Sequence, residues 1–134
     1  MSGGRESLSF DEQSKWRKQV TNAIKENYDC AKNPSFFNSV NYYNSEDIRY
    51  KPHREVMHFN LNALRNSDLV IVNFNDPSSL GTCAELAIAY DMKIPIVGIN
   101  KDGKELHPWL ECFCDKMCEN IREAVEYVVA FYLN

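Results

Sequence analysis

The spacing of apolar residues alternates along the chain between the period of helices and the continuous runs typical of buried strands. Near the start, Trp16, Val20 and Ile24 follow one another at intervals of four, which predicts a helix. Ser9 or Asp11 can cap the first turn of this helix. The amino-terminal part of the chain is therefore expected to pack one helical face against a core.

Helical spacing recurs over residues 53–66 and 120–133. In each segment, apolar residues three and four positions apart form one face. These residues are Val56, Phe59, Ala63 and Leu64 in the first segment, and Ile121, Ala124, Val125 and Val128 in the second. Both segments are predicted to be helices that cover a sheet.

Two β-branched runs, residues 68–74 and 94–99, are apolar on both faces, as strands in the middle of a parallel sheet must be. With a helix predicted over 82–91, they form a βαβ unit, whose crossover is nearly always right-handed. A short apolar piece within 35–43 is a further candidate strand. The predicted fold is one α/β domain, a three-layer sandwich with helices on both faces of the sheet.

The charge and hydropathy of the chain argue against nucleic acids and membranes as partners. The 134 residues include 15 Lys and Arg against 19 Asp and Glu, a formal net charge of −4. A general nucleic-acid binder needs a basic face, so no nucleic acid is expected as a partner. No stretch approaches the ~18 apolar residues of a membrane span, and the polar first thirty residues lack the apolar core of a signal peptide. We therefore expect no membrane association and a cytoplasmic protein.

Five cysteines, at positions 30, 83, 112, 114 and 118, are an odd number in a chain long enough to fold without disulfides. Reduced thiols are expected, as in a cytoplasm. Cys112, Cys114 and Cys118 can also be interpreted as three soft metal ligands, but their spacing differs from the paired two-residue gaps of zinc sites. We expect thiols that pack as small apolar groups, with no metal and no other cofactor.

The loop after the strand at 68–74 is the expected ligand site, because ligands of open parallel sheets bind outside the carboxyl ends of the strands. Ser78 and Ser79 offer hydroxyl groups there, and Gly81 allows the backbone to approach a ligand closely. The following helix presents unpaired N–H groups and a positive dipole end, which suit a phosphate. The glycine-rich motifs of nucleoside triphosphate and NAD sites are missing from the sequence, so these ligands are not expected.

Glu85, three residues after Thr82, has two interpretations. In a capping box, Thr82 accepts a hydrogen bond from the backbone N–H of Glu85, and the glutamate reaches back to the start of the helix. Alternatively, the helix dipole keeps a carboxylate in the first turn ionised, which makes it a good nucleophile. The residues alone leave both interpretations open.

Three segments of the predicted βαβ unit resemble those of a known enzyme superfamily. They read Asp68-Leu-Val-Ile-Val-Asn, Ser79-Leu-Gly-Thr-Cys-Ala-Glu85-Leu-Ala and Lys93-Ile-Pro-Ile-Val-Gly. Together they resemble the nucleoside 2-deoxyribosyltransferase superfamily, and the similarity extends to Arg54-Glu55 and to Ser2-Gly3-Gly4 ahead of a Phe-Asp-Glu-Gln-x-x-Trp helix. The resemblance implies that residues 1–134 form a single domain with a Rossmann-like (flavodoxin-like), mostly parallel sheet. It also implies that Glu85 attacks the anomeric carbon of a nucleoside, after which water or another base takes the sugar.

Ser79 indicates one branch of that superfamily. Members that act on free nucleosides have an acidic residue six positions before the glutamate, whereas the nucleoside 5′-monophosphate N-hydrolases have serine, as this chain does. A serine hydroxyl suits a phosphate, which an aspartate would repel. The resemblance therefore implies an N-glycosidase that cleaves the base–sugar bond of (deoxy)nucleoside 5′-monophosphates, with base exchange as the alternative.

The substrate-binding residues implied by the resemblance are Gly3, Gly4, Arg5, Asp68, Ser78, Ser79, Gly81 and His107. His107 would reach the phosphate bound by a neighbouring subunit. The alternatives are a flexible terminus for the Gly-Gly-Arg segment and a loop histidine without a role.

Asn60 departs from the superfamily, which has an aspartate there to support the sugar hydroxyls and the proton transfer. An amide can hold a hydroxyl but carries no proton, so slow turnover or a nucleotide-binding sensor is expected. The first strand of the fold is expected to be very short or missing. A homodimer is expected, because Ile88, Ala89, Tyr90 and Met92 exceed what one helix face can bury against the sheet.

Overall fold

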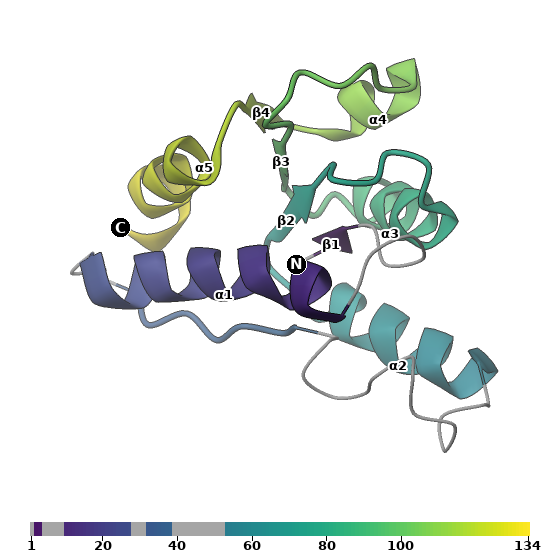
Figure 1. Ribbon diagram of the computed structural model, residues 1–134. Helices are drawn as coiled ribbons and strands as arrows, with labels where there is room; N and C mark the ends of the chain where they lie inside the picture. Colours follow the sequence, from purple (N-terminus) through teal and green to yellow (C-terminus); the bar gives the residue numbers. More distant parts are fainter. Residues whose placement is uncertain (1, 4–9, 28–31, 39–52) are drawn as a thin grey trace.

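The computed structural model describes residues 2–3, 10–27, 32–38 and 53–134, which form an α/β fold (Figure 1). The sheet has four strands in the order β1-β2-β3-β4, and all three pairings are parallel. The strands are β1 (Ser2–Gly3), β2 (Val70–Asn73), β3 (Ile96–Ile99) and β4 (Lys116–Cys118). The two strands predicted from β-branched runs are confirmed as β2 and β3, and β1 is very short, as expected.

The helices of the described residues account for most of the remaining chain. They are α1 (Phe10–Asn27), α2 (His53–Arg65), α3 (Leu80–Asp91), α4 (Pro108–Phe113) and α5 (Ile121–Val128), which continues into a π-helical turn, η3 (Val129–Leu133). The predicted helices at 53–66, 82–91 and 120–133 are confirmed as α2, α3 and α5 with η3. None of the helices in the described ranges has both the length and the apolar character to cross a membrane.

Two separate cores make the fold a three-layer sandwich, as predicted. Alternate strand residues point to opposite faces, so Ile71 and Val97 belong to one core while Val70 and Ile96 belong to the other. Helices α1 and α5 cover the first face, and α3 and α4 cover the second (Figure 1). A parallel sheet buried on both sides needs apolar residues at every position, which explains the unbroken runs in β2 and β3.

Two predictions about local structure need correction. Asp11 lies inside the first turn of α1 and is not its cap, while Ser9 lies outside the described residues. Residues 33–38 have no regular structure and join no described strand, so the strand predicted within 35–43 is wrong for this part. Residues 39–43 lie outside the described ranges.

The predicted inner face of α2 is only partly covered. No residue of this helix is fully buried, and Phe59 is 46% exposed. Helix α2 packs against α3, and Leu64 contacts the core of the second face. The ring of Phe59 lies 5.7 Å from that of Phe37, measured between centroids. Phe59 therefore contacts the connection at 33–38 through Phe37 and stays partly exposed.

Candidate active site at the carboxyl edge of the sheet

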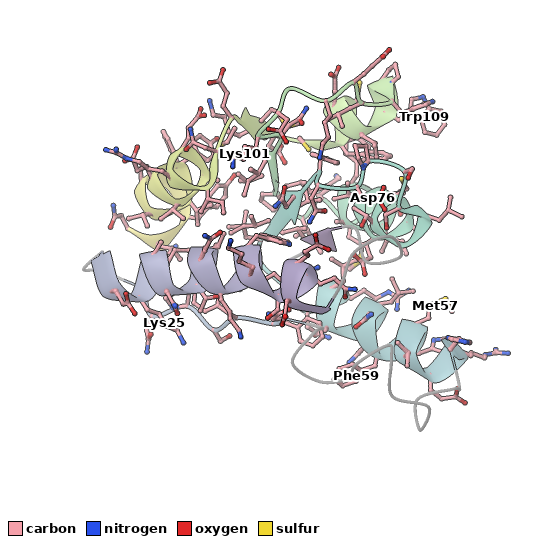
Figure 2. The ribbon with its side chains drawn as sticks, viewed as in Figure 1. Lys25, Met57, Phe59, Asp76, Lys101 and Trp109 are labelled. Atoms are coloured by element: carbon pink, nitrogen blue, oxygen red, sulfur yellow. The ribbon has the colours of Figure 1, made fainter. Side chains whose placement is uncertain are left out.

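The loop between β2 and α3 folds around the side chain of Asp76, which lies beside the start of α3 (Figure 2). Asp76 Oδ1 accepts hydrogen bonds from the backbone N–H of Ser78 at 3.2 Å and from its hydroxyl at 2.7 Å. The backbone N–H of Ser79 donates to the carbonyl of Asp76 at 3.2 Å. This turn gives the loop a defined shape. The Ser78 hydroxyl was expected to contact a phosphate, but here it donates its hydrogen bond to Asp76.

Ser79 is the N-cap of α3. Its Oγ accepts from the backbone N–H of Thr82 at 3.4 Å and from the Thr82 hydroxyl at 3.1 Å. The side chain is only 4% exposed. Helix α3 therefore begins two residues earlier than predicted, and the capping box of Thr82 and Glu85 is wrong. The turn around Asp76 ends at Ser79 and places this serine directly before the first residue of the helix. Its side chain can therefore accept from the first N–H groups of α3, which have no partner within the helix.

Glu85 and Asn60 lie on neighbouring helices. Glu85 is in the second turn of α3, one turn later than expected, and is half-buried. Asn60 is half-buried in the middle of α2. The packing of α2 against α3 places both residues on one side of the sheet.

The structure brings Gly3 to the candidate site but keeps Asp68 away from it. Gly3 pairs with Asn73 at the carboxyl end of β2, and β1 also contacts α3. Asp68 precedes the amino end of β2, so it lies at the opposite edge of the sheet from Ser79. The predicted contacts Gly4 and Arg5 lie outside the described residues.

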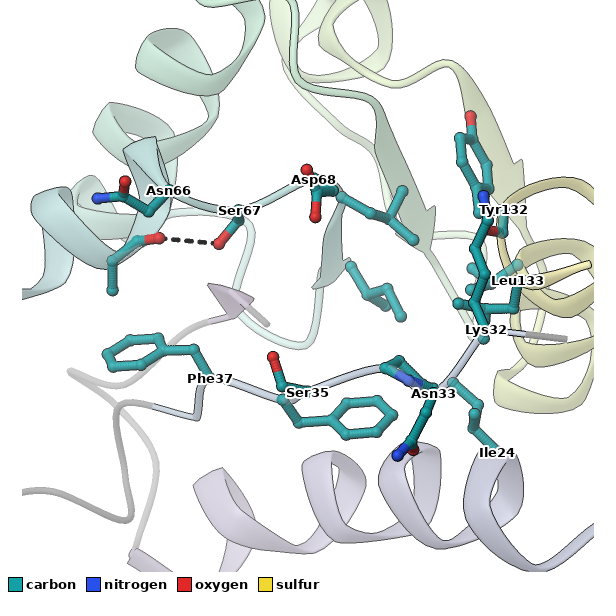
Figure 3. Close-up of a pocket in the computed structure, with 16 residues that line it drawn as sticks. Ile24, Lys32, Asn33, Ser35, Phe37, Asn66, Ser67, Asp68, Tyr132 and Leu133 are labelled. Atoms are coloured by element: carbon teal, nitrogen blue, oxygen red, sulfur yellow. Dashed lines mark hydrogen bonds between the residues drawn. The ribbon is translucent and has the colours of Figure 1, made fainter. Parts of the chain in front are cut away.

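A cavity of about 720 Å³ is lined in part by Asp68 (Figure 3). Its lining includes Lys32, Phe36, Ser67 and Tyr132, and the Ser67 hydroxyl is already bonded to the carbonyl of Ala63 at 2.8 Å. Neither Ser79 nor Glu85 lines this cavity. It is therefore distinct from the site expected at the carboxyl ends of the strands.

His107 caps α4, a role that the sequence did not indicate. Its Nδ1 accepts from the backbone N–H of Trp109 at 3.2 Å, and Pro108 occupies the first helical position, where it is favoured. The imidazole and the indole of Trp109 meet edge to face, with centroids 6.2 Å apart. His107 is therefore not a loop histidine without a role, and its predicted contact with a neighbouring subunit stays a prediction.

No sequence pattern indicated Lys104 as a residue of this site. This lysine lies in the connection from β3 to α4, and its Nζ donates to the carbonyl of Asn75 at 2.9 Å and to that of Phe74 at 3.5 Å. An isolated lysine in a polar loop belongs to no motif. The signal available in the sequence was topological, because loops that leave adjacent parallel strands meet at one edge of the sheet.

The carboxy-terminal cysteines differ in their surroundings. Burial, followed by the charge of Asp115 and the neighbouring Cys118, raises the pKa of Cys114 to about 12, and burial raises the pKa of Cys118 to about 11. Both thiols are therefore protonated at neutral pH. Cys112 is exposed, so the expectation of buried thiols is wrong for this residue. Within the described ranges, no three Cys, His, Asp or Glu side chains gather in a metal-binding group.

Comparison with known families identifies the chain at the family level. The family model described as "nucleoside 2-deoxyribosyltransferase like" matches residues 7–103, which is more than half of the 134 residues. The matched range contains Asn60, Ser79 and Glu85 and ends before Lys104 and His107. No curated protein matches the chain. The extent of the family match, together with the parallel α/β sheet that carries Ser79 and Glu85 beside one edge, shows that the chain belongs to the nucleoside 2-deoxyribosyltransferase-like family.

Proposed function

We propose that this protein is an N-glycosidase that cleaves the base–sugar bond of (deoxy)nucleoside 5′-monophosphates. The family is generally enzymatic, and its chemistry is glycosyl transfer or hydrolysis. The observation that carries the finer proposal is Ser79, which caps a 12-residue helix at the carboxyl edge of the sheet, six positions before Glu85. A helix start with a neutral cap offers N–H donors to a phosphate, without the repulsion that an acidic residue would add.

The reaction assigned to this site has two steps. The Glu85 carboxylate attacks the anomeric carbon while the bond from that carbon to the base nitrogen breaks, through an oxocarbenium-like transition state. The electron pair of the broken bond goes to the base, which leaves after gaining a proton. Water then attacks the glycosyl ester, which releases the sugar phosphate and regenerates the carboxylate.

Asn60 holds a sugar hydroxyl through its side-chain amide in this proposal. An amide cannot deliver a proton to the departing base, so turnover is expected to be slow. This same residue supports a second candidate function, a nucleotide-binding sensor that releases no base. Base exchange between nucleosides is the transferase alternative, and it would require a second base in place of water.

The test is incubation with each common nucleoside and deoxynucleoside 5′-monophosphate, followed by chromatography of the released base and intact mass of the protein. Glu85→Gln should abolish release, and Glu111→Gln, which removes the same charge from an exposed position on α4, should not. Asn60→Asp should raise the rate about 10²-fold or more, whereas Asn62→Asp, at an exposed position on the same helix, should leave it unchanged.

Several outcomes would decide against hydrolysis. If Asn60→Asp releases no base from any monophosphate and no sugar adduct forms on Glu85, the protein is a binder. If base appears only when a second base is supplied, the activity is transfer. Equal calorimetric affinity for nucleosides and their monophosphates would contradict the phosphate site.

We also propose that the protein is a homodimer that uses the outer surface of α3. Ala89 belongs to the core, which corrects one member of the predicted cluster, but Tyr90 and Met92 are 57% and 43% exposed. A helix that is apolar all round is typical of an element covered on more than one side. Sedimentation should show a dimer at micromolar concentration. Met92→Lys should weaken the dimer, and Met57→Lys on α2 should not.

A further inference from the structure

We propose that Lys104 makes the site specific for a phosphate-bearing substrate by supplying the positive charge that faces the phosphate. The inference rests on the proposed function and deepens it. The Lys104 ammonium donates to the carbonyls of Asn75 and Phe74, the first residues after β2. An ammonium has three donors, and these two bonds leave one for a ligand.

Hydrogen bonds from a residue at the carboxyl end of β3 fix the position of Lys104. Asn100 follows β3 directly, and its side chain clamps the lysine backbone: Oδ1 accepts from the Lys104 N–H at 2.9 Å, and Nδ2 donates to the Lys104 carbonyl at 2.8 Å. The Asn100 N–H in turn donates to the carbonyl of Cys118 at 2.9 Å, which ties the loop to β4. Gly103, with φ of 56°, takes the left-handed turn between them. The half-buried lysine is therefore held by its backbone as well as by its ammonium.

The ammonium lies at the start of the loop whose other end is the cap of α3. Asn75 is followed by Asp76, and Asp76 accepts the N–H of Ser79 through its carbonyl. A phosphate at the cap would face the Asp76 carboxylate in the loop and the Glu85 carboxylate one turn into the helix. Both carboxylates repel an anion, and a cation held at this loop offsets part of that repulsion.

Lys104 is the cation that the described residues show in contact with this loop. Lys101 lies in the same connection but is exposed (Figure 2). The hydrogen bonds from this connection to residues 74–79 come from Lys104 and not from Lys101. The two lysines therefore differ in placement and not in charge, which makes Lys101 a matched control.

The experiment is a calorimetric and NMR titration of the full chain with three probes. They are the four 2′-deoxynucleoside 5′-monophosphates, the four deoxynucleosides and inorganic phosphate. Lys104→Met should weaken the monophosphates and inorganic phosphate at least about 10-fold, while deoxynucleosides change less than about 2-fold. Lys101→Met should change none of them, and Lys104→Arg, which keeps the charge, should stay within about 3-fold of wild type for monophosphates. Circular dichroism of each variant checks that the fold is intact.

Other results would overturn the proposal in distinguishable ways. If Lys104→Met behaves like Lys101→Met while wild type still prefers monophosphates, the role of Lys104 is wrong and the proposed function stands. If Lys104→Met weakens the binding of nucleosides and monophosphates equally, Lys104 only stabilises the loop and does not contact the phosphate. If inorganic phosphate binds through Lys104 but wild type does not prefer monophosphates, the anion contact stands and the proposed function is wrong. If wild type binds no probe, both are overturned.

Discussion

Replacing Ser79 with aspartate separates the two roles assigned to this residue, the cap of α3 and the neutral contact for a phosphate. Aspartate is as good an N-cap as serine, and its carboxylate can accept the same bonds from the Thr82 N–H and hydroxyl. Because the side chain at this position is only 4% exposed, desolvation of the carboxylate offsets part of the cap, and we expect the free energy of unfolding of Ser79→Asp to lie between those of wild type and Ser79→Ala. Ser79→Ala, which loses the cap, should cost about 1 kcal/mol and lower Tm by about 4 °C.

The order of the two variants in ligand binding should be the reverse of their order in stability. Ser79→Ala loses one hydrogen bond to a charged group, about 1.5–3 kcal/mol of monophosphate binding free energy. Ser79→Asp loses that bond and adds repulsion between two negative charges, about 3 kcal/mol at about 5 Å and an effective dielectric constant of about 20. The affinity for monophosphates should therefore fall at least about 10²-fold in Ser79→Asp, with little change for free nucleosides.

The assay pairs calorimetric titration of one deoxynucleoside and its monophosphate with thermal unfolding of the three proteins. The reasoning predicts that Ser79→Asp is the more stable variant and the weaker monophosphate binder. Monophosphate affinity within about 3-fold of wild type in Ser79→Asp would show that Ser79 does not face the phosphate. If Ser79→Asp and Ser79→Ala lower Tm equally, the Ser79 side chain does not stabilise α3 as its N-cap.

Three further predictions concern packing and the thiols. Gly98→Ala should cost about 1–3 kcal/mol in calorimetric unfolding, because a Cβ there would lie 2.9 Å from Met117 Sδ and Phe74 Cε2; an unchanged Tm would contradict this packing. At pH 8, native alkylation followed by mass spectrometry should label exposed Cys112 well before Cys114, whose pKa of about 12 leaves about 10⁻⁴ of it as thiolate; equal rates would contradict the burial. Because the pKa of Cys114 is raised from 9.0 by folding, the unfolded chain loses this proton first, so the free energy of unfolding should fall as pH rises above 9.0 and fall less steeply in Cys114→Ser; identical slopes would count against the shift.

Much of the scaffold was predictable from the sequence, because burial on both faces of a sheet favours continuous runs of β-branched apolar residues. The apolar runs at β2 and β3 are typical of central parallel strands, and the residues predicted for the inner face of α5 include three that are buried, Ala124, Val125 and Val128. The signals were weaker where elements are short. The strand β4 has three residues and α4 has six, too few to show a period, and neither was predicted.

The sequence by itself determined that a polar turn and a helix start follow β2, and that Ser79 and Glu85 are six positions apart. Ser79 and Thr82 are both good caps, and the local turn around Asp76 selects the first, a choice that the sequence pattern left open. Only the tertiary structure decided that Lys104, about 30 residues along the chain from Asn75, reaches the same loop. Local propensity acts over a few neighbours, whereas the meeting of two loops at one sheet edge depends on parallel pairing between β2 and β3.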